Sequence, residues 1–177
     1  MSISVVVQWE PQRHTFVRDR DFGIIVIPES FIWPVCPADY VSAVAQYPGV
    51  TFDPTLKGQW HKHFPKPPKP LSRYQVSTMR CTDHERVVSD DVAFALQIED
   101  RCFLGYAGVL EAYCQKAHCF DLGLDYVVVG LPEDGEMVLA LKLVQHGSRP
   151  TLRGCDRDSE LWDPQTTRFL CFDQVTI

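Results

Sequence analysis

The chain has 177 residues, of which 45% are hydrophobic and 11% aromatic, and its formal net charge is −6. This composition provides for one sizeable core and excludes a chain that is disordered throughout. The seven cysteines are an odd number, and the first residues lack the basic flank and the long apolar run of a secretion signal or an anchor. We therefore expect reduced thiols in a cytoplasmic protein that does not enter a membrane.

The first predicted elements are two strands, over residues 3–9 and 22–27. Both runs are short and rich in β-branched residues, and Pro11 and Pro28 end them. The alternating charges of residues 18–21 predict the connection between the two strands.

A short helix is predicted next, over residues 38–47. Pro37 suits its first turn, where a missing amide proton costs nothing, and Pro48 with Gly49 ends it. Its larger side chains fall roughly on one side: Tyr40, Val41, Val44 and Tyr47.

Residues 48–71 predict a long irregular excursion with polyproline II character, because they contain six prolines and two glycines. Loops of this length are uncommon unless they serve a function. Between Pro54 and Thr82 the chain has six lysines and arginines and no carboxylate. We call residues 57–71 the basic strip. Its candidate binding residues are Lys57, Trp60, His61, Lys62, Phe64, Lys66 and Lys69.

Three interpretations of the basic strip remain open. Lysines interleaved with aromatic side chains suit an acidic protein or, over residues 57–80, a single-stranded nucleic acid, although the negative net charge argues against general nucleic-acid binding. A Lys-x-x-Pro-x-x-Pro pattern fits the ligands of polyproline-binding grooves. In the third interpretation, Trp60 and Phe64 fold back over the sheet and the strip is a rim loop.

Strand character returns over residues 74–82 and again over residues 92–98. In the second run large residues alternate with small or polar ones, and this period of two favours a strand. Ser89, Asp90 and Asp91 also suit the cap of a helix at this position. We predict the strand.

A helix near residues 103–117 and a β-hairpin over residues 124–144 form the predicted core. The helix has an apolar stripe at helical spacing: Tyr106, Val109, Leu110, Tyr113 and Cys114. The hairpin joins two strands rich in valine and leucine through residues 132–135, whose glycine suits the turn. Its second strand is apolar on both faces except at Lys142, which predicts a central place in the sheet.

Residues 147–166 predict turns, and a last strand is predicted over residues 168–176. The elements together predict an α+β fold, a mainly antiparallel sheet with one or two helices packed on it. We expect residues 1–177 to form a single globular domain with the Pro-rich basic excursion at residues 48–71.

Four thiol and imidazole side chains are candidate zinc ligands. Cys81 and His84 form one short spacing, and His118 and Cys119 form another, so two loops could together supply a tetrahedral set. Cys114 precedes the second pair, but it lies on the apolar stripe of the predicted helix and is assigned to the core. No other cofactor is expected.

A cysteine nucleophile is the second candidate chemistry. Cys102 lies where the predicted helix begins, and the helix dipole lowers the pKa of a thiol there. His118 or His146 would act as the base, and Asp121 or Asp125 would orient it. The sequence contains no phosphate-binding loop and no Gly-x-Ser-x-Gly elbow.

Residues 125–132, followed by Gly135 and an apolar strand, form a pattern similar to one in uncharacterised bacterial proteins that are often encoded beside secreted toxins. Gly58-x-Trp60, a proline stretch and the strand from Tyr74 resemble the upstream order of that family. The resemblance implies an antitoxin-like binding protein. We therefore expect a non-enzymatic protein of the immunity or inhibitor kind that binds another protein. A cysteine-dependent enzyme and a zinc-stabilised binding module are the alternatives.

Overall fold

The computed structural model describes residues 14–31, 37–54, 56, 69–98, 105–129, 137–142, 149–156 and 161–176. The strands are β1 (Phe16–Val26), β2 (Thr51–Phe52), β3 (Arg73–Cys81), β4 (Val87–Val88), β5 (Asp125–Val128), β6 (Met137–Lys142), β7 (Thr151–Asp156), β8 (Leu161–Trp162) and β9 (Thr167–Gln174). The helices are α1 (Pro37–Ala45), α3 (Ser89–Ile98) and α4 (Gly105–Lys116), and α4 continues into a short 3-10 helix, η2 (Ala117–Cys119). The strand predicted over residues 3–9 lies outside the described residues.

Seven strands form one sheet in the order β1-β3-β9-β5-β6-β7-β2, and β4 pairs with β8 in a separate two-stranded sheet. Most neighbours are antiparallel, and the pairs β5 with β9 and β2 with β7 are parallel. The predicted α+β fold with a mainly antiparallel sheet is therefore confirmed. Within the described residues, no helix combines the length and the apolar character needed to cross a bilayer.

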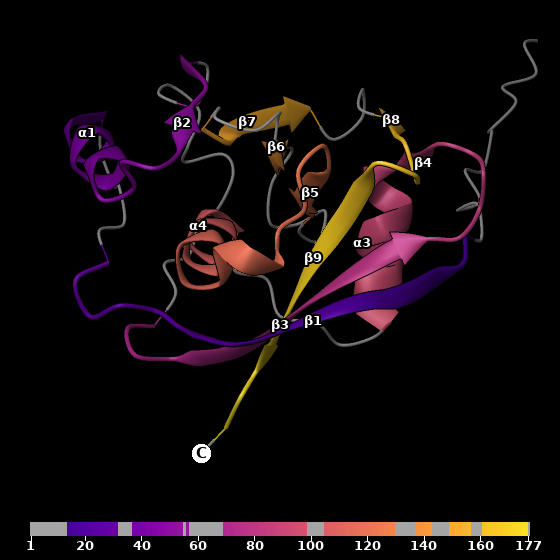
Figure 1. Ribbon diagram of the computed structural model, residues 1–177, viewed down its shortest axis with the longest axis horizontal. Helices are drawn as coiled ribbons and strands as arrows, with labels where there is room; N and C mark the ends of the chain where they lie inside the picture. Colours follow the sequence, from indigo (N-terminus) through magenta and orange to yellow (C-terminus); the bar gives the residue numbers. More distant parts are fainter. Residues whose placement is uncertain are drawn as a thin grey trace, which may run out of the picture.

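The large sheet carries helices on both faces (Figure 1). Helix α4 packs on one face through Val109 and Leu110, and α1 joins the same apolar cluster. Helix α3 packs on the other face, where Val92 and the side chain of Trp162 from β8 contact the sheet. Strand β9 serves both clusters, because successive side chains of a strand point to opposite faces. Phe169 and Cys171 belong to one cluster, and Leu170 and Phe172 belong to the other.

Strand β1 is longer than the predicted strand of residues 22–27, because it also contains the charged residues 18–21. These residues form an exposed part of the strand and not a connection between two strands. Two register shifts in the pairing of β1 with β3 lie among them and directly after them. Charges and bulges on the edge strand of a sheet discourage pairing with a second chain. The prediction of a loop here was wrong because a solvated edge strand does not require alternating apolar residues.

The two confirmed helices are α1 and α4, which cover the predicted ranges closely. On α4 the stripe faces the sheet at Val109 and Leu110, but Cys114 is exposed, so its assignment to the core was wrong. On α1 and the turn after it, Tyr47 is buried whereas Val41 is exposed. The buried side of this segment therefore includes Ala43, and it does not include Val41.

The strand predicted over residues 92–98 is wrong, because these residues belong to α3. Val92 and Ala93 are both buried and Phe94 is half exposed, whereas a period of two would bury Val92 with Phe94. Asp90 and Asp91 lie in the first turn, where their charges favour the positive end of the helix dipole. The helix-capping alternative was the right one.

The turns predicted over residues 147–166 were also wrong in part, because β7 and β8 lie within this range. The main chain of β7 pairs with β6 along its whole length and with the two-residue β2, which the sequence did not predict within the excursion of residues 48–71. Strands β5 and β6 form the predicted antiparallel pair, and β6 lies inside the sheet, between β5 and β7. The predicted strands over residues 74–82 and 168–176 are confirmed as β3 and β9.

Tyr126 of β5 lies in an aromatic cluster beneath α4. Its ring centroid is 4.5 Å from that of Phe120 and 6.2 Å from that of Phe22. Its hydroxyl oxygen accepts a hydrogen bond of 2.9 Å from the backbone N–H of Asp121. Burial raises the pKa of the Tyr126 phenol above its usual value, because the ionised form is poorly solvated there.

We expect Tyr126→Phe to lower the free energy of unfolding near neutral pH by about 1 kcal/mol, the value of one hydrogen bond. The pKa of Tyr126 is higher in the folded state than in the unfolded state, so the neutral phenol contributes to stability. This contribution is fully present below the unfolded-state pKa of about 10, and it is lost as the pH rises through the folded-state pKa. The variant should therefore lose less stability above pH ~10 than the wild type does. Urea unfolding at neutral and alkaline pH measures this difference. Tyr113→Phe in the same cluster is the control, and parallel curves for Tyr126→Phe and the wild type would contradict the prediction.

Candidate functional site

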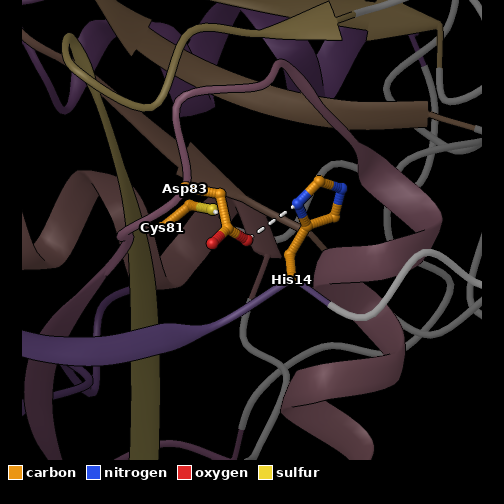
Figure 2. Close-up of side chains that lie close together, drawn as sticks. All are labelled: His14, Cys81 and Asp83. Carbon is orange, nitrogen blue, oxygen red and sulfur yellow. Dashed lines mark hydrogen bonds and ion pairs between the residues drawn. The ribbon is translucent and has the colours of Figure 1, made fainter.

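The pairing of β1 with β3 brings three polar side chains together at one end of the sheet. Phe16 pairs with Cys81. His14, two residues before Phe16, contacts Asp83, two residues after Cys81. The backbone supports this pairing, because Thr82 N–H donates to the carbonyl oxygen of Thr15 at 2.9 Å. Figure 2 shows the side chains of His14, Cys81 and Asp83 pointing toward one another. We call these three residues with Asp91 the His14 cluster.

The contacts of the His14 cluster are short. His14 Nδ1 lies 3.1 Å from Asp83 Oδ2, and Cys81 Sγ lies 3.7 Å from the same oxygen. The Thr15 backbone N–H also donates to Asp83 Oδ2, at 3.0 Å. On the other side of the ring, His14 Nε2 lies 3.3 Å from Asp91 Oδ2. One imidazole therefore lies between two carboxylates.

Burial differs among the members of the His14 cluster. The side chains of His14, Cys81 and Asp91 are almost fully buried, whereas the Asp83 side chain is 37% exposed. His14 Nε2 is buried and makes no hydrogen bond within the described residues, although Asp91 is close. The cluster is thus closed toward α3 and open to solvent at Asp83.

The surroundings shift the pKa values of Asp83 and Cys81 in opposite directions. The hydrogen bond from Thr15 N–H lowers the pKa of the Asp83 carboxyl below its usual range, and the His14 ring adds to this effect. Burial raises the pKa of the Cys81 thiol, and the nearby Asp83 charge adds to that rise. Because a nucleophilic cysteine requires a thiolate, Cys81 is not poised for nucleophilic attack. Nitrogen, sulfur and oxygen donors in one place are instead a potential metal-ligand set.

The four predicted zinc ligands do not gather. Among the residues that the structure describes, the metal-ligating group of three is His14, Cys81 and Asp83. His84 is exposed outside it, and His118 with Cys119 lies on η2 at the end of α4. The structure thus places Cys81 beside His14 and Asp83, whereas the sequence paired it with His84.

The proposed catalytic and binding residues are placed only in part. Cys102 and His146 lie outside the described residues, and His118 is exposed. In the basic strip, Lys69 is described and exposed. The remaining candidates of the strip lie outside the described residues: Lys57, Trp60, His61, Lys62, Phe64 and Lys66.

The described end of the basic strip is a tight turn before β3. Leu71 N–H donates to the carbonyl oxygen of Ile27 at 2.9 Å, and Ile27 N–H donates to that of Ser72 at 3.0 Å. Ser72 also donates to the carbonyl oxygen of Lys69 through both its N–H and its hydroxyl. Leu71 has a φ of +61° and is 61% exposed. The turn therefore holds an apolar side chain outward in a conformation that leucine rarely adopts.

Neither His14 nor Leu71 is evident from local sequence. His14 is 69 positions from Asp83, so only the strand register brings the two together. The one available signal was Cys81-x-Asp83, because residues two apart at the end of a strand lie on the same side. No family model, curated protein or solved structure matches the chain.

Proposed function

We propose that this protein is a non-enzymatic binding protein of the immunity or inhibitor kind, and that it binds another protein through the Leu71 turn and the basic strip. The observation that supports this proposal is the backbone of Leu71. A bulky residue in the left-handed region costs about 1–3 kcal/mol, and such strain concentrates at functional sites. Here the strained residue also exposes most of an apolar side chain.

The chemistry of the strip indicates the partner. Leu71 lies within the stretch from Pro54 to Thr82, which has six basic residues and no carboxylate, and Lys69 near it is exposed. An acidic protein surface with an apolar pocket for a leucine is complementary to this pair of features. The backbone hydrogen bonds of Leu71 and Ser72 fix the turn before binding, which reduces the ordering cost of association.

An enzyme based on Cys81 is less well supported, because burial raises the pKa of that thiol. The alternative of an enzyme with Cys102 as its nucleophile is tested by the reactivity of the cysteines. A catalytic Cys102 should be alkylated near neutral pH faster than the other six cysteines, and a slow, uniform pattern would remove it from consideration.

The decisive experiment separates the side chain of Leu71 from its backbone strain. Leu71→Ala removes the side chain and keeps a residue that disfavours positive φ, whereas Leu71→Gly removes both. We expect both variants to weaken partner binding about tenfold, the effect of losing one strong interface contact. Only Leu71→Gly should also raise the free energy of unfolding, by about 1 kcal/mol.

Capture from a lysate of the source organism with nuclease added, followed by titration of the purified partner, measures the change in affinity. Leu122→Ala is the matched control, because Leu122 is 53% exposed on a different turn. Joint charge reversal of Lys57, Lys62, Lys66 and Lys69 should weaken capture and leave folding intact. Capture that is equal for the wild type and both Leu71 variants would refute the Leu71 interface. Retention of nuclease-sensitive material alone would refute a protein partner.

A further inference from the structure

We propose that the His14 cluster is a binding site for a divalent zinc-class ion, with His14 Nδ1, Cys81 Sγ and a carboxylate oxygen of Asp83 as ligands. Asp91 is a positioning residue that holds the His14 ring through Nε2. This site is separate from the proposed protein-binding surface, and neither depends on the other.

The distances between the donor atoms fit this assignment. Zinc bonds of about 2.0 Å to nitrogen or oxygen and about 2.3 Å to sulfur, arranged tetrahedrally, place N and O about 3.3 Å apart and S and O about 3.5 Å apart. The structure has His14 Nδ1 at 3.1 Å and Cys81 Sγ at 3.7 Å from Asp83 Oδ2. All three ligand atoms lie within 4.8 Å of one another. Only small side-chain shifts are needed to enclose an ion.

The contact with Asp91 places a second carboxylate beside the His14 ring, with Asp91 Oδ2 3.3 Å from Nε2. On the other side of the ring, His14 Nδ1 lies at hydrogen-bond distance from Asp83 Oδ2, 3.1 Å. An ion bound here takes the place of the proton that otherwise lies between these two atoms. A histidine held by a carboxylate through one nitrogen and by a metal through the other is a recurrent arrangement in zinc sites.

The mixture of donors selects the class of metal. Calcium and magnesium bind oxygen ligands, so a thiol and an imidazole disfavour them. Zinc accepts nitrogen, sulfur and oxygen together, with a thiolate as the sulfur ligand. The ion replaces the thiol proton of Cys81, and this proton passes to solvent. Asp83 is the exposed member, so a water molecule can supply the fourth ligand from that side.

The test uses the full chain, freed of metal by a chelator and then titrated with Co²⁺, which reports a thiolate ligand through its charge-transfer absorption. Competition with Zn²⁺ then gives the zinc affinity. We expect one ion per chain and a thiolate-to-cobalt band. Asp83→Asn and Cys81→Ser should each weaken the affinity more than tenfold, and Cys81→Ser should abolish the band.

The controls make the assignment specific. Cys171 is a second buried cysteine, in the same apolar cluster as Cys81, and Cys171→Ser should keep both the band and the affinity. Asp91→Asn should keep the band and weaken the affinity by about 10- to 100-fold, as expected for a residue that orients a ligand. The unfolding midpoint of each metal-free variant shows that a loss of binding is not a loss of fold. If Cys81→Ser does not fold, Asp83→Asn, with its partly exposed side chain, decides.

Two results would overturn the proposal. Absence of a cobalt band in the folded wild type would leave the His14 cluster as an ion pair without a metal site. A band that survives in Cys81→Ser would place the metal elsewhere. An unchanged affinity in Asp91→Asn would refute the positioning role of Asp91.

Discussion

Trp162→Ala is expected to lower the free energy of unfolding by about 3–5 kcal/mol, the cost of deleting a buried aromatic side chain. Trp162 lies on the short strand β8, yet its side chain is almost fully buried beneath α3. Its indole N–H donates to Ser89 Oγ at 2.9 Å, and the Arg153 guanidinium carbon lies 5.9 Å from the ring centre. The truncation leaves a cavity and also deprives a fully buried hydroxyl of its donor.

Urea unfolding followed by far-UV circular dichroism measures this loss, because the signal does not depend on the deleted indole. Trp162→Phe keeps most of the volume and removes the hydrogen bond, so it should lose about 1–3 kcal/mol. Leu161→Ala is the matched control, since its side chain is half exposed on the same strand. If Trp162→Ala were as stable as Leu161→Ala, the indole would not anchor β8 and α3.

Glu111→Leu is expected to lower the free energy of unfolding by about 1–3 kcal/mol, the cost of a buried polar group that loses its partner. Glu111 of α4 is only 5% exposed. The Tyr47 hydroxyl, just after α1, donates to Glu111 Oε1, and Gln115 donates to Glu111 Oε2 at 2.8 Å. Gln115 in turn bonds both the N–H and the carbonyl oxygen of Val26 in β1. One carboxylate thus joins two helices and the edge of the sheet.

A double-mutant cycle with Tyr47→Phe tests this network. Because Tyr47→Phe removes the hydroxyl that Glu111→Leu deprives of its acceptor, the double variant should lose less stability than the two single variants combined. Thermal or urea unfolding of the four proteins gives the coupling energy directly. Strict additivity would show that the Tyr47 hydroxyl and Glu111 do not interact in solution.

The elements that the sequence predicted correctly show their character in their own residues. Helix α4 has one apolar stripe, and the strands β5 and β9, which lie between two covered faces, carry apolar residues on both sides. Helix α3 was predicted as a strand because large and small residues alternate in its sequence. In the structure, the neighbouring residues Val92 and Ala93 are both buried, which a strand with one buried face would not allow. The helix-capping residues Ser89, Asp90 and Asp91 indicated the helix correctly, but the prediction gave more weight to the alternation of residue sizes.

Other elements are determined by partners distant in the chain. The two-residue strand β2 exists because β7 offers it a parallel edge, and β8 exists because the side chain of Trp162 enters the core beneath α3. The His14 cluster has the same origin, since it depends on the register of β1 against β3. Local patterns do not encode such contacts, so the fold class was predictable and the candidate site was not.

The position of β9 constrains the order in which the sheet can be completed. Every other strand of the described sheet precedes β9 in the chain, and β9 lies between β3 and β5. Until β9 has been synthesised, no strand hydrogen-bonds the pair β1 and β3 to the group β5, β6, β7 and β2. Both ladders then expose an unpaired edge, and these are the edges most open to mispairing with other chains on the ribosome. Because β3 and β9 are separated by about 90 residues, closure of the sheet is also expected to be slow.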